Sequence, residues 1–312
     1  MVWTGNSTID YAVLTHFHND HFGGYTSSLP KSSNSDTYSL IGFAEIFDNF
    51  KIGTLLDRGY PDYNYPFNMA TMADNAPSCS NYINAVKWHV ANQKFDAAIF
   101  KAGANDQIVQ KYNPAKYPTA KVQNVAVNGE IWTGSGTTTK KTFPELSEIS
   151  YENSKNITSS DNCPPENITS CVMKVSYGNF DFFAGGDLQY NGRSSHAWKD
   201  AELPCAKAVG QVELLKANHH GVTNTNQVDA LKALNPQTIV VNSWVDCHPR
   251  TDILNSMETT LPACDMFITN FWQGDRPSGV DDRVTAEEAA RVKGYDGHIC
   301  LLYTSELPTN SR

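Results

Sequence analysis

Three histidines and an aspartate fall within six positions near the start of the chain, in the segment Thr15-His16-Phe17-His18-Asn19-Asp20-His21. The apolar run Tyr11-Ala12-Val13-Leu14 directly precedes them and predicts a buried strand. His16 and His18 share one face of an extended segment, because side chains alternate along a strand. Asp20 and His21 can turn toward a neighbouring point once the backbone bends. We therefore expect a strand that delivers ligands for two adjacent metal ions.

The alternative is that this cluster is a coincidence on a polar surface loop. The whole chain of 312 residues holds nine histidines, so three of them within six positions are a marked concentration. Imidazole and carboxylate groups are also among the few side chains that hold zinc and other first-row metals. The sequence therefore favours a metal site over an ordinary loop.

The composition, with 40% hydrophobic and 18% charged residues, is that of a globular chain that can bury a full core. A net charge of −9 argues against an extended nucleic-acid surface, although two bound dications would reverse the sign locally. No run of about eighteen apolar residues predicts a membrane segment, and residues 1–7 lack a signal-peptide pattern. The sequence does not indicate an oligomeric state.

A second carboxylate follows a predicted hairpin. Residues 171–177 alternate like a half-buried strand, and residues 180–184 run back to Gly185-Gly186-Asp187. Glycines at a strand end allow a close approach of the backbone, which suits a carboxylate that bridges two cations. Taken alone, Gly-Gly-Asp could also be a simple turn. On these residues alone a turn is the simpler interpretation, and Asp187 is the alternative, a candidate metal ligand.

Two further predicted strands end in histidine. The strand 212–217 leads into Asn218-His219-His220-Gly221, and the strand 238–242 leads toward His248-Pro249. Helical patterns over residues 41–50, 80–93 and 228–234 lie between the strands and predict a layered α/β sandwich. His89, beside the apolar stripe of the second of these helices, is expected on the helix surface rather than in the site.

In this order the motifs resemble those of the metallo-β-lactamase-fold hydrolase superfamily, in the branch of the ComEC-type hydrolase domain and the phosphorylcholine esterases. The resemblance spans residues 8–299 and rests on H-x-H-x-D-H at 16–21, N-x-x-S at 167–170, G-G-D at 185–187, H-H-G at 219–221 and H-P at 248–249. It implies an αββα sandwich, which we expect as a single domain over residues 1–299.

The resemblance also implies a ligand set. His16 and His18 would hold one metal, Asp20 and His21 the other, and Asp187 would bridge them. A further histidine would complete the second site. The resemblance points to His248, with His219 and His220 facing the substrate, but one of that pair could replace His248. Many relatives supply a third histidine to the first metal, and here Asn167 stands at the corresponding motif while His89 is the only histidine in the interval.

The function that follows is hydrolysis of a phosphoester or phosphodiester, in a small molecule or a phosphodiester substrate, by a metal-bridging hydroxide. The two divalent cations would be zinc, or alternatively manganese. Asp20 would orient the hydroxide, and His219 or His220 would stabilise or protonate the leaving group. The alternatives are a lactone, thioester or β-lactam hydrolase with the same metal pair, and a metal-binding module without turnover.

Both ends of the chain depart from the family pattern. Relatives carry several strands before the first motif, whereas here fifteen residues precede His16. We expect a longer natural N-terminus, and a signal peptide there would make the protein secreted or periplasmic. Residues 300–305 match the translation of a transposon adapter, so we expect residues 300–312 to be a sequencing artefact outside the fold.

Overall fold

The computed structural model describes residues 8–151, 153, 155, 157–158, 160–190, 196–272 and 285–299. The expected artefactual tail, residues 300–312, lies outside the described residues. The predicted α/β class is confirmed, because the described chain alternates strands and helices around two sheets.

The smaller sheet has three parallel strands in the order β1-β2-β3. They are β1 (Thr8–Val13), β2 (Lys51–Asp57) and β3 (Asp96–Ile99). The larger sheet is mixed, with nine strands in the order β12-β11-β10-β9-β8-β7-β4-β5-β6. Its strands are β4 (Lys121–Val127), β5 (Glu130–Trp132), β6 (Thr139–Lys141), β7 (Val172–Tyr177), β8 (Phe180–Ala184), β9 (Leu214–Lys216), β10 (Thr238–Val241), β11 (Asp265–Ile268) and β12 (Gly294–Tyr295).

The helices connect and cover these strands. They are α1 (Asn19–Phe22), α2 (Phe43–Asn49), α3 (Met69–Met72), α4 (Ala76–Ala91), α5 (Glu202–Val209), α6 (Val228–Leu234), α7 (Thr251–Thr260) and α8 (Ala286–Arg291), with short 3-10 turns η1 (Leu146–Glu148), η2 (Glu166–Thr169), η3 (Ala197–Lys199) and η4 (Asn218–Gly221). No helix among the described residues has the length and apolarity that crossing a membrane requires.

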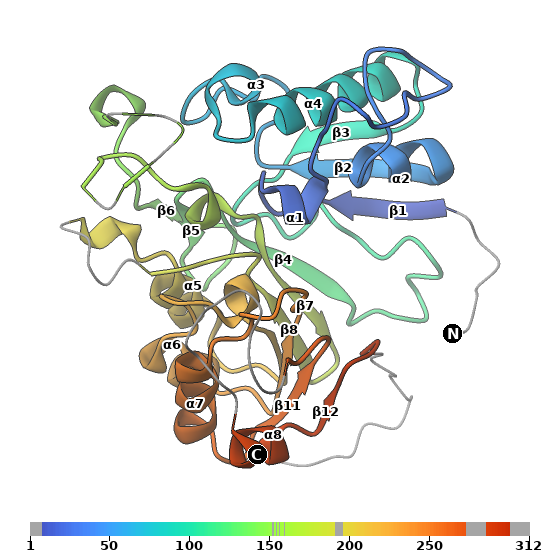
Figure 1. The fold of residues 1–312 in the computed structure, drawn as a ribbon. Coiled ribbons are helices and arrows are strands. Elements are labelled where there is room, and N and C mark those ends of the chain that lie inside the picture. Colours follow the sequence, from blue (N-terminus) through green and yellow to red (C-terminus); the bar gives the residue numbers. More distant parts are fainter. Residues whose placement is uncertain are drawn as a thin grey trace.

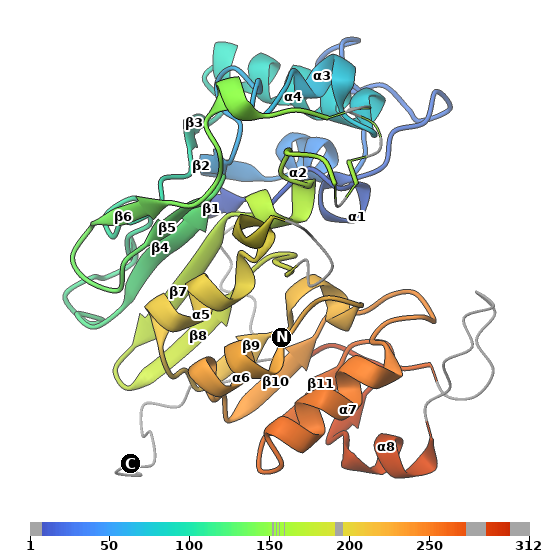
Figure 2. The same cartoon turned by 90° about the vertical axis from the view of Figure 1, so that its left-hand side faces the viewer.

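Three separate apolar clusters define the layers. One, which includes Leu55 and Phe47, packs α2 and α4 against the smaller sheet, and another, which includes Leu215 and Leu254, packs α5, α6 and α7 against the larger sheet. The third, built around Leu56 and Phe100, lies between the two sheets. Helices therefore form the two outer layers and the sheets the two inner ones (Figures 1 and 2).

Local sequence chemistry accounts for several element boundaries. The β4–β5 hairpin turns at Asn128 and Gly129, whose φ values of 49° and 76° are those that Asn and Gly tolerate best. Helix α6 occupies the predicted span and ends at Asn235 in the left-handed conformation, and Pro236 follows because it cannot continue a helix. The hairpin predicted from residues 171–184 is confirmed as the antiparallel pair β7–β8.

The fold brings several strand ends to one place. Strands β8, β9 and β10 are parallel neighbours, so the segments that follow them leave the same edge of the larger sheet. The end of β1 reaches this edge too, because the backbone N–H of Cys171 donates to the carbonyl of Thr15 at 2.8 Å. This junction between the sheets sets the position of the candidate site.

Candidate metal centre

The loop after β1 turns sharply into α1, and this turn gathers the first motif. The side chain of His16 is fully buried, and its Nε2 lies 3.1 Å from Nδ1 of His18. One helical turn places Asp20 and His21 side by side, with 3.5 Å between Nε2 of His21 and Oδ2 of Asp20. The hydroxyl of Thr15 lies 3.3 Å from Nδ1 of His21, which leaves Nε2 facing the centre.

Asp187 follows β8 and lies at the middle of the cluster, with 1% of its surface exposed. Its Oδ2 lies 3.1 Å from His21, 3.4 Å from His220, 3.7 Å from His16 and 3.8 Å from His219, measured to Nε2 of each. The preceding Gly186 has a φ of 60°, and a Cβ there would approach Ser170 to 2.9 Å. A glycine is required at this position so that the carboxylate can enter the cluster.

His219 and His220 project from η4 in an uncommon backbone conformation. Their φ values are 43° and 55°, in the left-handed region that non-glycine residues rarely adopt. The carbonyl of Asn242 accepts a hydrogen bond of 2.5 Å from Nδ1 of His220, so that Nε2 points toward Asp20 at 3.2 Å. Such outliers concentrate at functional sites, where the surrounding structure holds them in place.

Four of these side chains form one compact donor set. Donor atoms of Asp20, His21, Asp187 and His220 all lie within 4.8 Å of one another. Two imidazoles and two carboxylates make a mixed nitrogen and oxygen set, which suits zinc and related first-row ions. The sequence left open whether His248 or one of His219 and His220 joins these donors; in the structure His220 lies among them and His248 does not.

Three further histidines, His16, His18 and His219, lie near the same donor set. His16 and His18 come from the first motif, and His219 approaches Oδ2 of Asp187 from η4. The amide nitrogen of Asn167 lies 3.2 Å from Nδ1 of His219. The sequence predicted no third histidine near His16 and His18. In the structure His219 lies there, beside Asn167.

The buried oxygen Oδ1 of Asp187 supports the fit of a cation. Among the described residues, no donor lies within hydrogen-bond distance of this atom, and the nearest cation, Lys216 Nζ, is 3.6 Å away. A buried carboxylate oxygen without a hydrogen bond is costly unless a positive charge compensates it. Lys216 supplies part of this charge at Oδ1, and the donor set around Oδ2 fits a divalent cation held by Asp187.

The electrostatics keep the carboxylates ionised. The hydrogen bond with His220 lowers the pKa of Asp20 to about 2, against the opposing effect of burial. Burial would raise the pKa of Asp187, but hydrogen bonds with His21 and His220 and the charge of Lys216 hold that pKa well below its usual range. Both carboxylates are therefore in the form that binds cations.

Two of the histidines are held neutral. Burial and the nearby His21 keep the pKa of His16 well below its usual value, and burial lowers the pKa of His219 to about 4. His220 differs: burial acts to lower its pKa, but hydrogen bonds with Asp187 and Asp20 raise it to about 9. A cation at this point would have to replace the proton of His220.

The remaining two histidines of the sequence analysis lie outside the donor set. The ring of His248 stacks on that of His220, with 5.5 Å between centroids. The expectation that His89 lies on a helix surface is wrong, because it is buried in α4, 3.0 Å from Asp48 and 3.2 Å from the hydroxyl of Tyr38. The apolar pattern of α4 did not predict these contacts, because Asp48 and Tyr38 belong to other segments of the chain.

Sequence reasoning missed the residues that support the site. The fully buried Arg58 donates hydrogen bonds to both carboxylate oxygens of Glu166. Glu166 also accepts a hydrogen bond of 2.6 Å from the backbone N–H of Phe17, the residue between His16 and His18 in the sequence. Lys216 donates to the carbonyl of Gly186 at 2.7 Å. A single Arg or Glu in a loop carries no pattern, so only the folded contacts reveal these roles.

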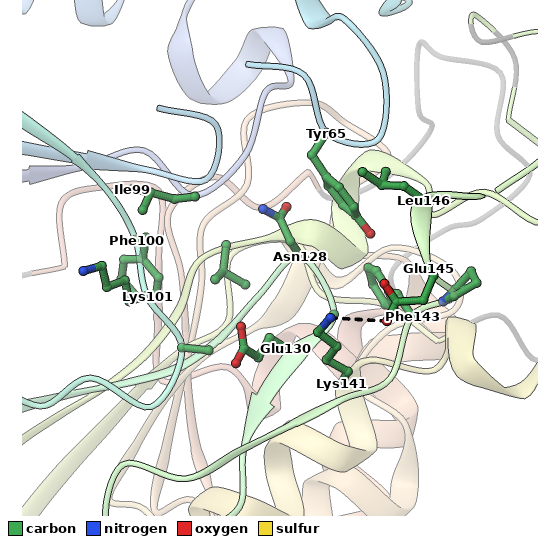
Figure 3. A pocket seen from close by; sticks show the side chains of 14 residues that line it. Tyr65, Ile99, Phe100, Lys101, Asn128, Glu130, Lys141, Phe143, Glu145 and Leu146 are labelled. Carbon is green, nitrogen blue, oxygen red and sulfur yellow. Dashed lines mark hydrogen bonds and ion pairs between the residues drawn. The ribbon is translucent and has the colours of Figure 1, made fainter. Parts of the chain in front are cut away.

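The largest described cavity is not at the cluster. It has a volume of about 510 Å³ and lies near β3, β4 and β5, where an exposed ion pair joins Lys141 to Glu145 (Figure 3). A smaller cavity of about 220 Å³ is lined by His18 and Asn167. The smaller one adjoins the candidate metal centre through these two residues.

Comparison with known protein families found no family model that matches the chain, and no curated protein matches it.

Proposed function

We propose that this chain is a hydrolase with two divalent cations and a metallo-β-lactamase-like αββα fold. The observation that carries the proposal is the position of Asp187, whose Oδ2 faces two donor groups at once. A carboxylate shared in this way is suited to bridge a metal pair. The helix-sheet-sheet-helix layers, and the first motif at the end of β1, agree with the proposed fold.

The residues divide into two sets around Asp187. His16, His18 and His219 would hold one cation, and Asp20, His21 and His220 the other. Zinc is the expected ion, with manganese as the alternative, because the set mixes imidazole and carboxylate donors. A bound pair of such cations would activate water near neutral pH and stabilise negative charge on the reacting group.

The chain's own groups then orient the reaction. Asn242 fixes the ring of His220 through Nδ1, and Thr15 faces Nδ1 of His21, so both rings present Nε2. With both His219 and His220 close to Asp187, His248 is the histidine left to face the substrate. Its ring stacks on that of His220, which places it beside the donor set.

A phosphoester or phosphodiester is the proposed substrate because the order of the motifs resembles that of such enzymes. Fold and metal pair alone do not choose among substrates. The test is a chromogenic panel of a phosphodiester, a phosphomonoester, a lactone and a cephalosporin, with protein reconstituted with zinc or manganese. We expect turnover of the phosphodiester or monoester, and its loss in Asp187→Asn.

Turnover of the lactone or the cephalosporin alone would replace the proposed substrate class. No turnover at full metal content would contradict the enzyme and leave a metal-binding module. Asp181→Asn, in the same strand β8 and paired with Lys174, is a matched control that should keep full activity.

A further inference from the structure

We infer that the 220 Å³ cavity beside His18 is a subsite for an apolar, single-ring group of the substrate ester. This inference rests on the proposed function, since it places the anionic part of the ligand at the metal centre. The residues that carry it are His18, Asn167, Phe67, Met69, Ile157 and Pro164.

Two residues that line the cavity contact histidines of the candidate metal centre. His18 lies 3.1 Å from His16, and Asn167 lies 3.2 Å from His219, measured between ring or amide nitrogens. Both contacted histidines approach Oδ2 of Asp187 within 4 Å. A ligand with its anionic group near Asp187 can therefore extend a substituent past His18 into the cavity.

The apolar part of the cavity wall comes from two segments. Phe67 and the buried Met69 belong to the segment that follows β2, while Ile157 and the buried Pro164 belong to the segment before η2. The ring of Phe67 packs against Tyr151 at a centroid distance of 5.5 Å. Apolar walls of this kind with a few polar groups at one end are typical of small-molecule sites.

Among the described residues that line the cavity, the partly buried charge of Glu166 is already neutralised. Its carboxylate accepts hydrogen bonds from Arg58 and from the backbone N–H of Phe17. Two other charged residues of this lining, Asp74 and Lys155, have opposite signs and are exposed. The described lining therefore offers no unpaired buried charge that would select a charged substituent.

The size of the cavity limits the occupant. Sites for drug-sized ligands have volumes of about 300–1,000 Å³, whereas this cavity measures about 220 Å³. It accommodates a phenyl-sized group and is too small for several linked nucleotides. The inferred ligand class is thus a small aryl phosphate or phosphonate ester rather than a nucleic-acid strand.

The test compares methylphosphonate with phenylphosphonate as ligands of the full, metal-loaded chain, by calorimetric titration. Hydrophobic pockets discriminate groups that differ by one methylene by about ten- to two-hundredfold, so we expect phenylphosphonate to bind at least about tenfold more tightly. Phe67→Ala and Ile157→Ala should each remove most of that preference while methylphosphonate binding stays unchanged. Phe50→Ala, an exposed phenylalanine next to α2, should keep it.

The two proposals fail in different ways. If neither phosphonate binds the wild-type protein while its metal content is full, the anion site at the metal centre is wrong. If methylphosphonate binds and phenylphosphonate binds no better, the subsite is overturned. A preference that survives in both Phe67→Ala and Ile157→Ala would also overturn it, and unchanged methylphosphonate binding shows that these variants are folded.

Discussion

His220 is the residue whose role the structure changes most. The resemblance pointed first to His248 as the last ligand, with one of His219 and His220 as its possible replacement. In the fold, Nε2 of His220 lies 3.2 Å from Asp20 and 3.4 Å from Asp187, and His248 stacks behind its ring. This geometry supports our proposal that His220, and not His248, is the ligand, with His248 beside it.

This assignment predicts different metal contents for two alanine variants. His220→Ala should lower the affinity for one cation by at least about a hundredfold. Loss of a residue that only hydrogen-bonds to a metal ligand already lowers metal affinity by about ten- to a hundredfold. His248→Ala should keep two cations per chain. Metal content after dialysis against limiting zinc measures both. A His248→Ala variant that loses a cation while His220→Ala keeps both would restore the first expectation.

The sequence could predict which residue types form the site, but not the choice between these two histidines. Both follow a strand end, so spacing alone treats them alike. The difference arises from the positive φ values at His219 and His220, which turn both rings inward. Positive φ is usually signalled by glycine or asparagine, and here neither residue marks the position.

At the scale of elements, η4 is held in this conformation by a buried carboxylate on α5. Glu202 is 1% exposed and accepts hydrogen bonds from the side chain of Asn218 at 2.7 Å and from the backbone N–H groups of Asn226 and Gln227 at 2.5 and 2.9 Å. Burial raises the pKa of Glu202 from 4.5 to about 7, against these hydrogen bonds. The conformation of η4, which carries the proposed ligands His219 and His220, thus depends on the titratable group of Glu202.

The raised pKa of Glu202 predicts a pH-dependent stability. Between pH 4.5 and about 7 the folded chain keeps a proton on Glu202 that the unfolded chain releases. This contribution is fully present below pH 4.5 and is lost as the pH rises through 7. Relative to Glu202→Gln, the free energy of unfolding of the wild type should therefore fall by about 1–3 kcal/mol between pH 5 and 8.

Urea unfolding of chelator-treated protein at pH 5 and pH 8 measures this difference. Glu45→Gln, in the first turn of α2, is the control and should give parallel changes with the wild type. A wild type that gains stability over Glu202→Gln as the pH rises would contradict the pKa assignment.

Element prediction succeeded where the apolar pattern was strong and missed two short strands. The helices α2, α4 and α6 and the β7–β8 hairpin lie where the apolar pattern predicted them. The four-residue strands β3 and β11 were not predicted, because their partners lie far away in the sequence and only the assembled sheets define them. Pairing between distant segments is invisible to a local pattern.

At the scale of the whole molecule, the site lies where the two sheets meet. Leu56 and Phe100 from the smaller sheet pack with Val127 and Cys171 from the larger one. The hydrogen bond from Cys171 to Thr15 and the buried Arg58–Glu166 pair cross the same junction. The proposed ligands follow strands of both sheets, so the junction must form before the candidate site can.

A shared core predicts that the chain unfolds as one unit, in keeping with the single domain expected from the sequence. Fluorescence and circular dichroism should give coincident urea transitions. Leu56→Ala should lower the free energy of unfolding by about 2–5 kcal/mol and shift both probes together. Leu146→Ala, at a 57% exposed position, is the control and should change little. Two separate transitions would mean that the sheets fold independently.

The most direct test of the metal centre is elemental analysis of the reconstituted chain and of Asp187→Asn. Because Asp187 faces both donor groups, the wild type should bind close to two zinc or manganese ions per chain, and Asp187→Asn should retain fewer than one. Asp181→Asn should bind as many as the wild type. A wild type without bound metal, or an Asp187→Asn variant that keeps both ions, would contradict a shared dinuclear site.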